Sequence, residues 1–310
     1  MEKIKKKRNK IIFIVIVLLI VLIIGFGISK LIPEGNAVSS DEIAVIQVFG
    51  AISFSDSGIP FQGRNANAQT IIDNIEKAKA KNVKAVVFEI DSPGGTVVAS
   101  KQVAEAIRRL NKPTVAVIRE TGASGAYWIA ASTDKIVADE LSITGSIGVI
   151  SSYLEFSDLL NKYGVEYARL VSGKYKDIGS PLKDLTDEEK ELLQKKLDLV
   201  DEFFVGYVKE RRNLTNEEVN RIKTGEFFLG KEAKDLHLID YTGNKEFAIK
   251  LAKDIGNVKD AKVTEFKEKK TLLDLFSSYT SEAFYYMGRG IGTEISNMGV
   301  KKGSNLDIIA

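Results

Sequence analysis

Beyond its amino terminus, the first half of the chain alternates two patterns of apolar and polar residues. Short apolar runs rich in β-branched side chains have the length and composition of strands, and they lie at 42–49, 83–90 and 113–118. Between them, apolar residues recur at helical spacing with charged residues opposite, at 66–81 and 96–111. Strands and helices that alternate at this spacing predict βαβ units and a parallel sheet. We therefore expect an α/β fold.

The second half of the chain is predicted to be more helical. Thr186 and Thr215 are each followed three residues later by a glutamate, which is the capping-box pattern of a helix start. A long helix is expected from Thr186 towards Arg212, and a shorter one after Thr215. Further strands are predicted at 135–138, 146–150 and 165–171. An amphipathic stretch at 271–288 could pack on the domain, on a neighbouring subunit or at a membrane surface.

The amino-terminal region has the pattern of a membrane anchor. Residues 11–29 carry no charge, and a helix of this length spans roughly 28 Å, close to the hydrocarbon thickness of a bilayer. Lysines and arginine precede it, which predicts a cytoplasmic amino terminus and an extracytoplasmic main domain. A cleaved signal peptide, ending near Ala37, is the alternative. The apolar run is longer than in most signal peptides, which favours a retained helix.

These patterns divide the chain into five regions. They are a cytoplasmic basic tail (1–10), a transmembrane helix (11–29), a linker (30–41), the main domain (42–268) and a carboxyl-terminal amphipathic helix with a tail (269–310).

Composition excludes several classes of function. The first ten positions hold six of the 44 basic and one of the 42 acidic residues, which leaves 38 basic and 41 acidic residues elsewhere. The main domain therefore lacks the basic excess of a nucleic-acid-binding surface. The chain has no cysteine and a single histidine, His237, so thiolate chemistry and Cys-ligated zinc are excluded. We expect neither a metal nor a cofactor.

A glycine-rich turn, Asp91-Ser92-Pro93-Gly94-Gly95, follows the 83–90 strand. Ligands bind at the carboxyl ends of strands in open parallel sheets. Consecutive glycines allow a close approach of the backbone and can aim N–H groups at a substrate. The turn lacks the lysine and Ser/Thr of a phosphate loop. A turn with no further role is the alternative.

A second turn places Ser124 between small residues at the start of a predicted helix. Its hydroxyl would be accessible there, and the N–H of Gly125 could join the Gly94 and Gly95 amides around an oxyanion. A close-packed helix of small residues is the alternative. The G-x-S-x-G pattern is absent, because Ala126 occupies the place of its second glycine.

A nucleophilic serine needs a base. His237 lies among charged and apolar residues typical of a packed or surface position, so a lysine is the other candidate. A lysine must be desolvated to accept a proton at neutral pH. The segment 171–181 contains Lys174 and Lys176 among apolar and aromatic residues, and spacing alone does not choose between them.

Four ordered segments, DSPGG, TGASGAYWIA, TGSIGVI and SGKYKDIGSP, resemble the signal peptide peptidase A (SppA) family. The resemblance covers roughly residues 42–250. It implies a membrane-bound relative of Clp protease and the crotonase superfamily, with a fold of stacked ββα units and a serine peptidase domain at 42–268. The sequence departs from the family pattern at Thr121-Gly122, where a serine or alanine commonly precedes the ASG segment, and we expect only a local effect.

The resemblance also implies roles for individual residues. Ser124 matches the nucleophile and Lys176, rather than Lys174, the general base. Gly94 or Gly95 supplies oxyanion amides together with Gly125. We further predict that Ser146 orients the lysine.

The implied protein is a Ser-Lys endopeptidase that cleaves residual signal peptides or other short hydrophobic peptides at the outer face of the membrane. Family members form homo-oligomeric rings, and the short bacterial forms share each active site between adjacent subunits. Three alternatives stay open. They are a membrane Clp-like protease of the type with stomatin partners, a crotonase-type acyl-CoA enzyme, and a scaffold without activity.

Overall fold

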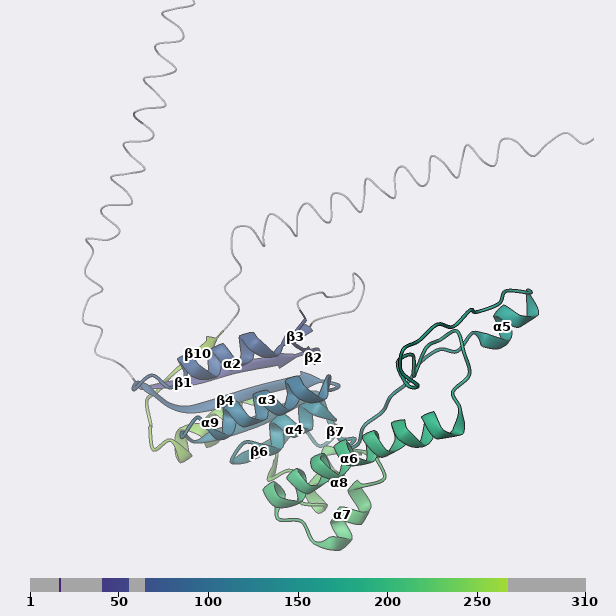
Figure 1. Ribbon diagram of the computed structural model, residues 1–310. Coiled ribbons are helices and arrows are strands. Elements are labelled where there is room, and N and C mark those ends of the chain that lie inside the picture. Colours follow the sequence, from purple (N-terminus) through teal and green to yellow (C-terminus); the bar gives the residue numbers. More distant parts are fainter. Residues whose placement is uncertain (1–16, 18–40, 56–64, 267–310) are drawn as a thin grey trace, which may run out of the picture. The chain divides into compact units, whose positions relative to one another are not determined.

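A largely parallel, eight-stranded sheet forms the centre of the described domain (Figure 1). The computed structural model describes residue 17 and residues 41–55 and 65–266. The sheet has the order β10-β1-β4-β5-β6-β9, with β1 (Glu42–Phe49), β4 (Val83–Ser92), β5 (Thr114–Ala123), β6 (Lys135–Ala138), β9 (Tyr241–Thr242) and β10 (Lys262–Phe266). The pairs from β1 to β9 are parallel. The predicted α/β class is confirmed.

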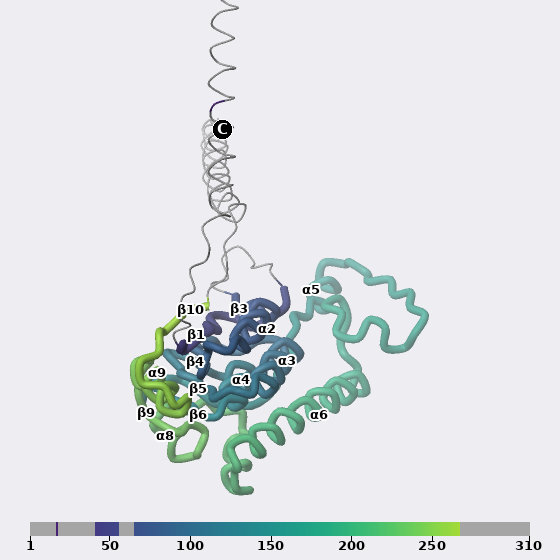
Figure 2. The backbone as a smooth tube through the Cα atoms, turned by 90° about the vertical axis from the view of Figure 1, so that its left-hand side faces the viewer, coloured from purple at the N-terminus to yellow at the C-terminus, as the bar shows by residue number. Residues whose placement is uncertain are grey.

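Helices cover both faces of this sheet, which explains why its strands are apolar on both sides. α9 (Lys245–Ile255) packs Ala248 and Ala252 against one face, where Ile43, Val87 and Val117 lie. Figure 2 shows α2 (Ala68–Lys77), α3 (Val97–Arg108) and α4 (Gly125–Ala131) on the opposite side.

Two small strand pairs flank the carboxyl ends of the central strands. β2 (Ala51–Ser53) pairs with β3 (Asn65–Asn67), and Ile52 also bridges to Gly95. β7 (Ile143–Gly145) pairs with the end of β5 and with β8 (Phe227–Leu229). These pairs fix the turns that follow β4 and β5.

Both predicted capping boxes are present. They begin α6 (Asp187–Arg212) and α7 (Asn216–Ile222), and in each the threonine and glutamate side chains satisfy each other's backbone N–H groups. α6 packs on α4, where Trp128 of α4 stacks on Phe204 of α6 with ring centroids 4.4 Å apart. Two further helices of the described residues are α5 (Ser157–Lys162) and α8 (Gly230–Asp235).

Two predicted strands are wrong. At 146–150, Ser146 has a left-handed backbone (φ 47°), which ends β7, and Ile150 is 89% exposed. Residues 165–171 are exposed and pair with no strand among the described residues, so their apolar side chains do not form a buried ladder.

The chain divides into residues 1–265 and 266–310. The predicted transmembrane helix (11–29), apart from Val17, and the amphipathic stretch at 271–288 lie outside the described residues. Across 41–55 and 65–266, no helix combines the length and apolar character needed to span a bilayer.

Candidate active site

Ser124 occupies a strained turn between β5 and α4. Its backbone angles are φ 53° and ψ −126°, which a non-glycine residue adopts only when the surrounding structure holds it there. The Ser124 N–H donates to the Gly145 carbonyl (2.8 Å), and the Ser124 carbonyl accepts from the Trp128 N–H (3.0 Å). A sharp strand-to-helix turn of this kind presents a nucleophile at the end of a sheet.

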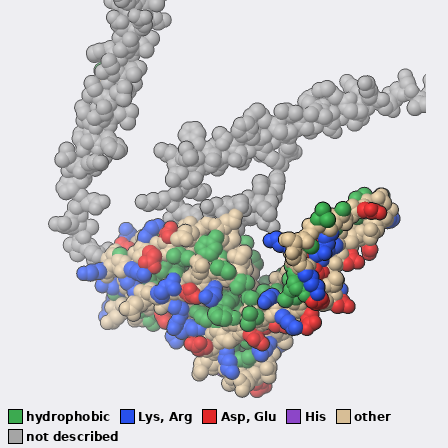
Figure 3. Space-filling model, viewed as in Figure 1, with side chains coloured by type: hydrophobic (Ala, Val, Ile, Leu, Met, Phe, Trp, Pro, Cys, Tyr) green, Lys and Arg blue, Asp and Glu red, His purple; other side chains and the backbone are tan. Residues whose placement is uncertain are grey.

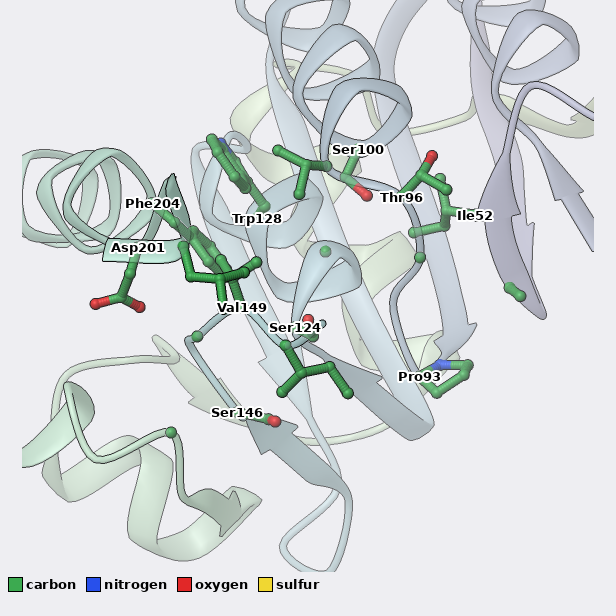
Figure 4. Close-up of a pocket in the computed structure, with 18 of the residues that line it drawn as sticks. Ile52, Pro93, Thr96, Ser100, Ser124, Trp128, Ser146, Val149, Asp201 and Phe204 are labelled. Carbon is green, nitrogen blue, oxygen red and sulfur yellow. The ribbon is translucent and has the colours of Figure 1, made fainter. Parts of the chain in front are cut away.

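The Ser124 side chain lines a cavity of about 1070 Å³ (Figure 4). This volume lies slightly above the usual range of about 300–1,000 Å³ for ligand sites. The glycine turn after β4 forms one wall, and residues of α6, including Phe204, form another. Trp128, Val149 and Leu197 add apolar surface. The cavity is therefore large enough for an extended ligand beside the serine, and its walls carry both apolar and polar groups.

Gly94 packs directly against the serine. Its φ is +106°, and a Cβ at this position would lie 2.9 Å from the Ser124 Cβ and 2.9 Å from the Gly125 nitrogen. Only glycine fits this position without a shift. The Gly94 N–H donates to the Ser92 Oγ (3.1 Å), so it is already engaged within the turn.

Two other amides lie beside Ser124. The Gly95 nitrogen is 3.3 Å from the point that a Cβ on Gly125 would occupy. Gly125 is the first residue of α4, where an N–H has no partner within the helix. Among the described residues, the Gly95 N–H has no backbone acceptor. Gly95 and Gly125 therefore present two adjacent donors, the arrangement that stabilises an oxyanion.

Ser146 lines the same cavity as Ser124. It follows β7, and its N–H donates to the Glu226 carbonyl (2.9 Å). The structure thus brings together five of the residues singled out from the sequence, namely Gly94, Gly95, Ser124, Gly125 and Ser146.

Lys176 does not join them within one chain. It is exposed, it lies outside the cavity lining, and its amine has no ion-pair partner in the described part of the chain. Lys174 instead pairs with Glu188, and this hydrogen bond raises the pKa of Lys174. A raised pKa opposes the role of a general base.

The cavity lining contains three charged residues that sequence reasoning missed, Asp198, Asp201 and Lys223. Asp201 of α6 lines the cavity, and burial raises the pKa of its carboxyl group. Lys223, the C-cap of α7, lines it as well. The capping boxes predicted both helices, but no pattern in the sequence indicates which helix face closes the cavity.

His237 lies outside the cavity lining and pairs with Glu218. In residues 41–55 and 65–266, no group of three or more His, Asp or Glu side chains could hold a metal ion.

A strained serine at a strand-to-helix turn, beside two amides for which the described residues offer no backbone acceptor, indicates a serine hydrolase of α/β fold. Comparison with known proteins identifies its family. The model of "Peptidase family S49" matches residues 106–259. A relative from Methanocaldococcus jannaschii, named as a protease, is 35% identical over 83% of each chain. One from Enterococcus faecium, named as a signal peptide peptidase SppA, is 33% identical over 79% of this chain and 75% of that protein. The chain belongs to peptidase family S49 and is a serine peptidase.

Among solved structures, a mutant of the 1510-N membrane-bound stomatin-specific protease in complex with a substrate peptide is similar, with a TM-score of 0.48 and 14% identity. It covers 78% of this chain and 99% of its own.

Proposed function

We propose that the protein is a membrane-anchored endopeptidase with a Ser124–Lys176 dyad. It cleaves residual signal peptides or other short hydrophobic peptides at the outer face of the membrane. The observation that carries this proposal is the position of Ser124 in the cavity beside the Gly95 and Gly125 N–H groups. We also propose the stacked ββα architecture of the Clp protease and crotonase folds for its domain.

In the proposed reaction, the neutral Lys176 amine takes the proton of the Ser124 hydroxyl, whose oxygen attacks a peptide carbonyl carbon. The Gly95 and Gly125 N–H groups stabilise the resulting oxyanion, and each such donor contributes about 3–4 kcal/mol in comparable sites. The protonated lysine then donates to the leaving amine. Water, deprotonated by the same lysine, hydrolyses the acyl-enzyme. Ser146, on the cavity wall, orients the lysine.

A second copy of the chain supplies Lys176 in this proposal. The segment between β7 and α6 exposes large apolar side chains, and Figure 3 shows several hydrophobic residues on its surface. Ile150, Leu154 and Leu170 are 89%, 72% and 97% exposed. A monomer rarely exposes so much apolar surface in one segment, whereas a subunit interface would bury it. Such an interface in a homo-oligomeric ring would bring Lys176 to the cavity of a neighbour.

The proposed substrate class follows from the cavity and from the proposed anchor. Trp128, Val149 and Phe204 give the cavity apolar walls, which favour hydrophobic peptides. An uncharged segment at 11–29 would hold the domain near such peptides. The name of the Enterococcus faecium relative agrees with signal peptides as substrates.

The test is a peptide-cleavage assay on the detergent-solubilised full chain. We expect Ser124→Ala and Lys176→Ala each to abolish cleavage, and Lys174→Ala to retain it. When the two inactive variants are co-expressed in equal amounts, random pairing leaves about one quarter of shared sites intact, and activity should recover to that extent. Near-normal turnover by Lys176→Ala would disprove its role as the base. Absence of recovery would disprove shared sites.

The same assay addresses the alternatives. A protease of the type with stomatin partners would cleave one defined membrane protein and leave residual signal peptides intact. An acyl-CoA enzyme would not form a covalent adduct between Ser124 and a fluorophosphonate probe, and membership of peptidase family S49 already argues against this alternative.

A further inference from the structure

One buried hydroxyl near the site has no hydrogen-bond partner. Ser100 lies in the first turns of α3, directly after the glycine turn, and it is fully buried. Its N–H donates to the Thr96 carbonyl, but its Oγ has no partner in the described structure. A serine in a helix often returns its hydroxyl to the carbonyl four residues earlier, and this one does not. Because a buried hydroxyl without a partner destabilises the folded state, alanine would be the more stable choice.

The Ser100 side chain instead contacts the backbone of Gly125. A Cβ added to Gly125 would lie 2.3 Å from the Ser100 Oγ and 3.0 Å from the Ser100 Cβ. The same point lies 3.3 Å from the Gly95 nitrogen. Ser100 is therefore packed against the Cα of Gly125, on the side that faces the Gly95 nitrogen. Figure 4 shows Ser100 and Ser124 at the same cavity.

We propose that Ser100 is a positioning residue for the oxyanion hole. Its side chain fixes the Gly125 peptide relative to Gly95, and this sets the spacing of the two N–H donors. Ser100 does not contact the reacting atoms, because its Oγ is shielded from solvent. The inference rests on the proposed function, since it assumes that these two amides bind an oxyanion.

Replacement of Ser100 should have a combination of effects on stability and activity that replacement of an ordinary packing residue would not have. Removal of the hydroxyl takes away an unsatisfied polar group, so Ser100→Ala should keep or raise the melting temperature. It also leaves space into which the Gly125 peptide can move. Misplaced oxyanion donors stabilise the transition state less, so kcat should fall roughly tenfold while KM changes little.

The test measures the melting temperature, kcat, KM and the affinity for a peptide aldehyde. The aldehyde forms a tetrahedral adduct with Ser124 and so reports on the oxyanion hole. We expect its affinity to fall by the same factor as kcat in Ser100→Ala. The same peptide without the aldehyde should bind equally well to Ser124→Ala with and without the Ser100→Ala change, because ground-state binding does not use the hole.

Ser132→Ala is the matched control. Ser132 is also a buried serine, but its Oγ bonds to the Trp128 carbonyl and to the Tyr207 hydroxyl, each at 2.8 Å. Its replacement should lower the melting temperature and leave kcat and aldehyde affinity unchanged.

Unchanged kcat and aldehyde affinity in Ser100→Ala would overturn the inference, and so would a lowered melting temperature or a failure to fold. A wild-type protein that a fluorophosphonate does not label at Ser124 would overturn the proposed function itself. The two failures are thus distinguishable.

Discussion

Replacement of Gly94 by alanine should disable the site through two separable effects. The first is conformational, because φ +106° is unfavourable for a residue with a Cβ and costs roughly 1–3 kcal/mol. The second is steric. The new Cβ would lie 2.9 Å from the Ser124 Cβ and 3.0 Å from the Ala123 carbonyl oxygen, and backbone must shift to relieve this contact. Overpacking of this kind adds about 1–3 kcal/mol, so we expect a total loss of about 2–6 kcal/mol.

The steric effect would displace Ser124, the proposed nucleophile, so it should lower activity as well as stability. A displacement of Ser124 approaching 1 Å would reduce the rate about 10²-fold. The assay is the rate of Ser124 labelling by a fluorophosphonate, measured beside urea denaturation of the same variant. Labelling is preferable to turnover here, because it reports on the serine and the adjacent amides with a small reagent.

Gly164→Ala separates the two effects. Gly164 also has a positive φ (+68°), but, apart from its own chain neighbours, no atom of the described residues lies within 4 Å of an added Cβ. Its replacement should cost only about 1 kcal/mol and leave labelling unchanged, with assembly checked by gel filtration. If Gly94→Ala labels Ser124 at the wild-type rate and loses no more stability than Gly164→Ala, the proposed contact between the turn and the serine is wrong.

Two predictions concern pH. Burial raises the pKa of Asp201, so loss of its proton destabilises the folded state once the pH exceeds the ordinary pKa of a carboxyl group. Asp201→Asn should therefore have a higher melting temperature than wild type at pH 7, and the difference should vanish in acid. Hydrogen bonds from His237, and then from the Thr215 backbone, lower the pKa of Glu218 to about 2. Glu218 therefore stabilises the fold above about pH 4.5 and loses this effect as the pH falls towards 2. Glu218→Gln should melt lower than wild type at pH 7 and converge with it near pH 2, and a constant difference across this range would contradict the assignment.

The sequence predicts the central sheet well because its strands are buried on both faces. The runs at 42–49 and 83–90 are nearly continuous apolar segments without the alternating polar positions of a half-exposed strand. They coincide with β1 and most of β4. The predicted strand at 113–118 extends to Ala123 in the structure, because β7 and β4 pair with its small-residue end. Local side-chain chemistry was equally informative at the two capping boxes, where four residues determine the helix start.

The sequence predicts only those site residues whose positions follow from their place directly after a strand. Glycines and a serine that follow adjacent parallel strands must meet at one edge of the sheet, which is why Gly94, Gly95 and Ser124 come together. Asp201 and Lys223 reach the cavity from α6 and α7, and their approach depends on tertiary packing that no spacing in the sequence specifies. The predicted strand at 165–171 failed for a related reason, because no strand of the described residues pairs with it and its residues are exposed.

There is a physical reason why the proposed catalytic groups would be divided between two copies of the chain. The nucleophile and the oxyanion donors need positions accurate to a few tenths of an ångström, and rigid elements of one chain supply them through the strained turn at Ser124 and the tight contact of Gly94. The base needs a desolvated amine, and an exposed segment of a single chain cannot provide that environment for Lys176. Burial of the segment against a second copy would remove water from the lysine and from the apolar residues around it in the same step. Under our proposal, assembly would therefore supply the low-dielectric environment that makes the lysine a base, and an isolated chain would hold an accurately built nucleophile without the group that activates it.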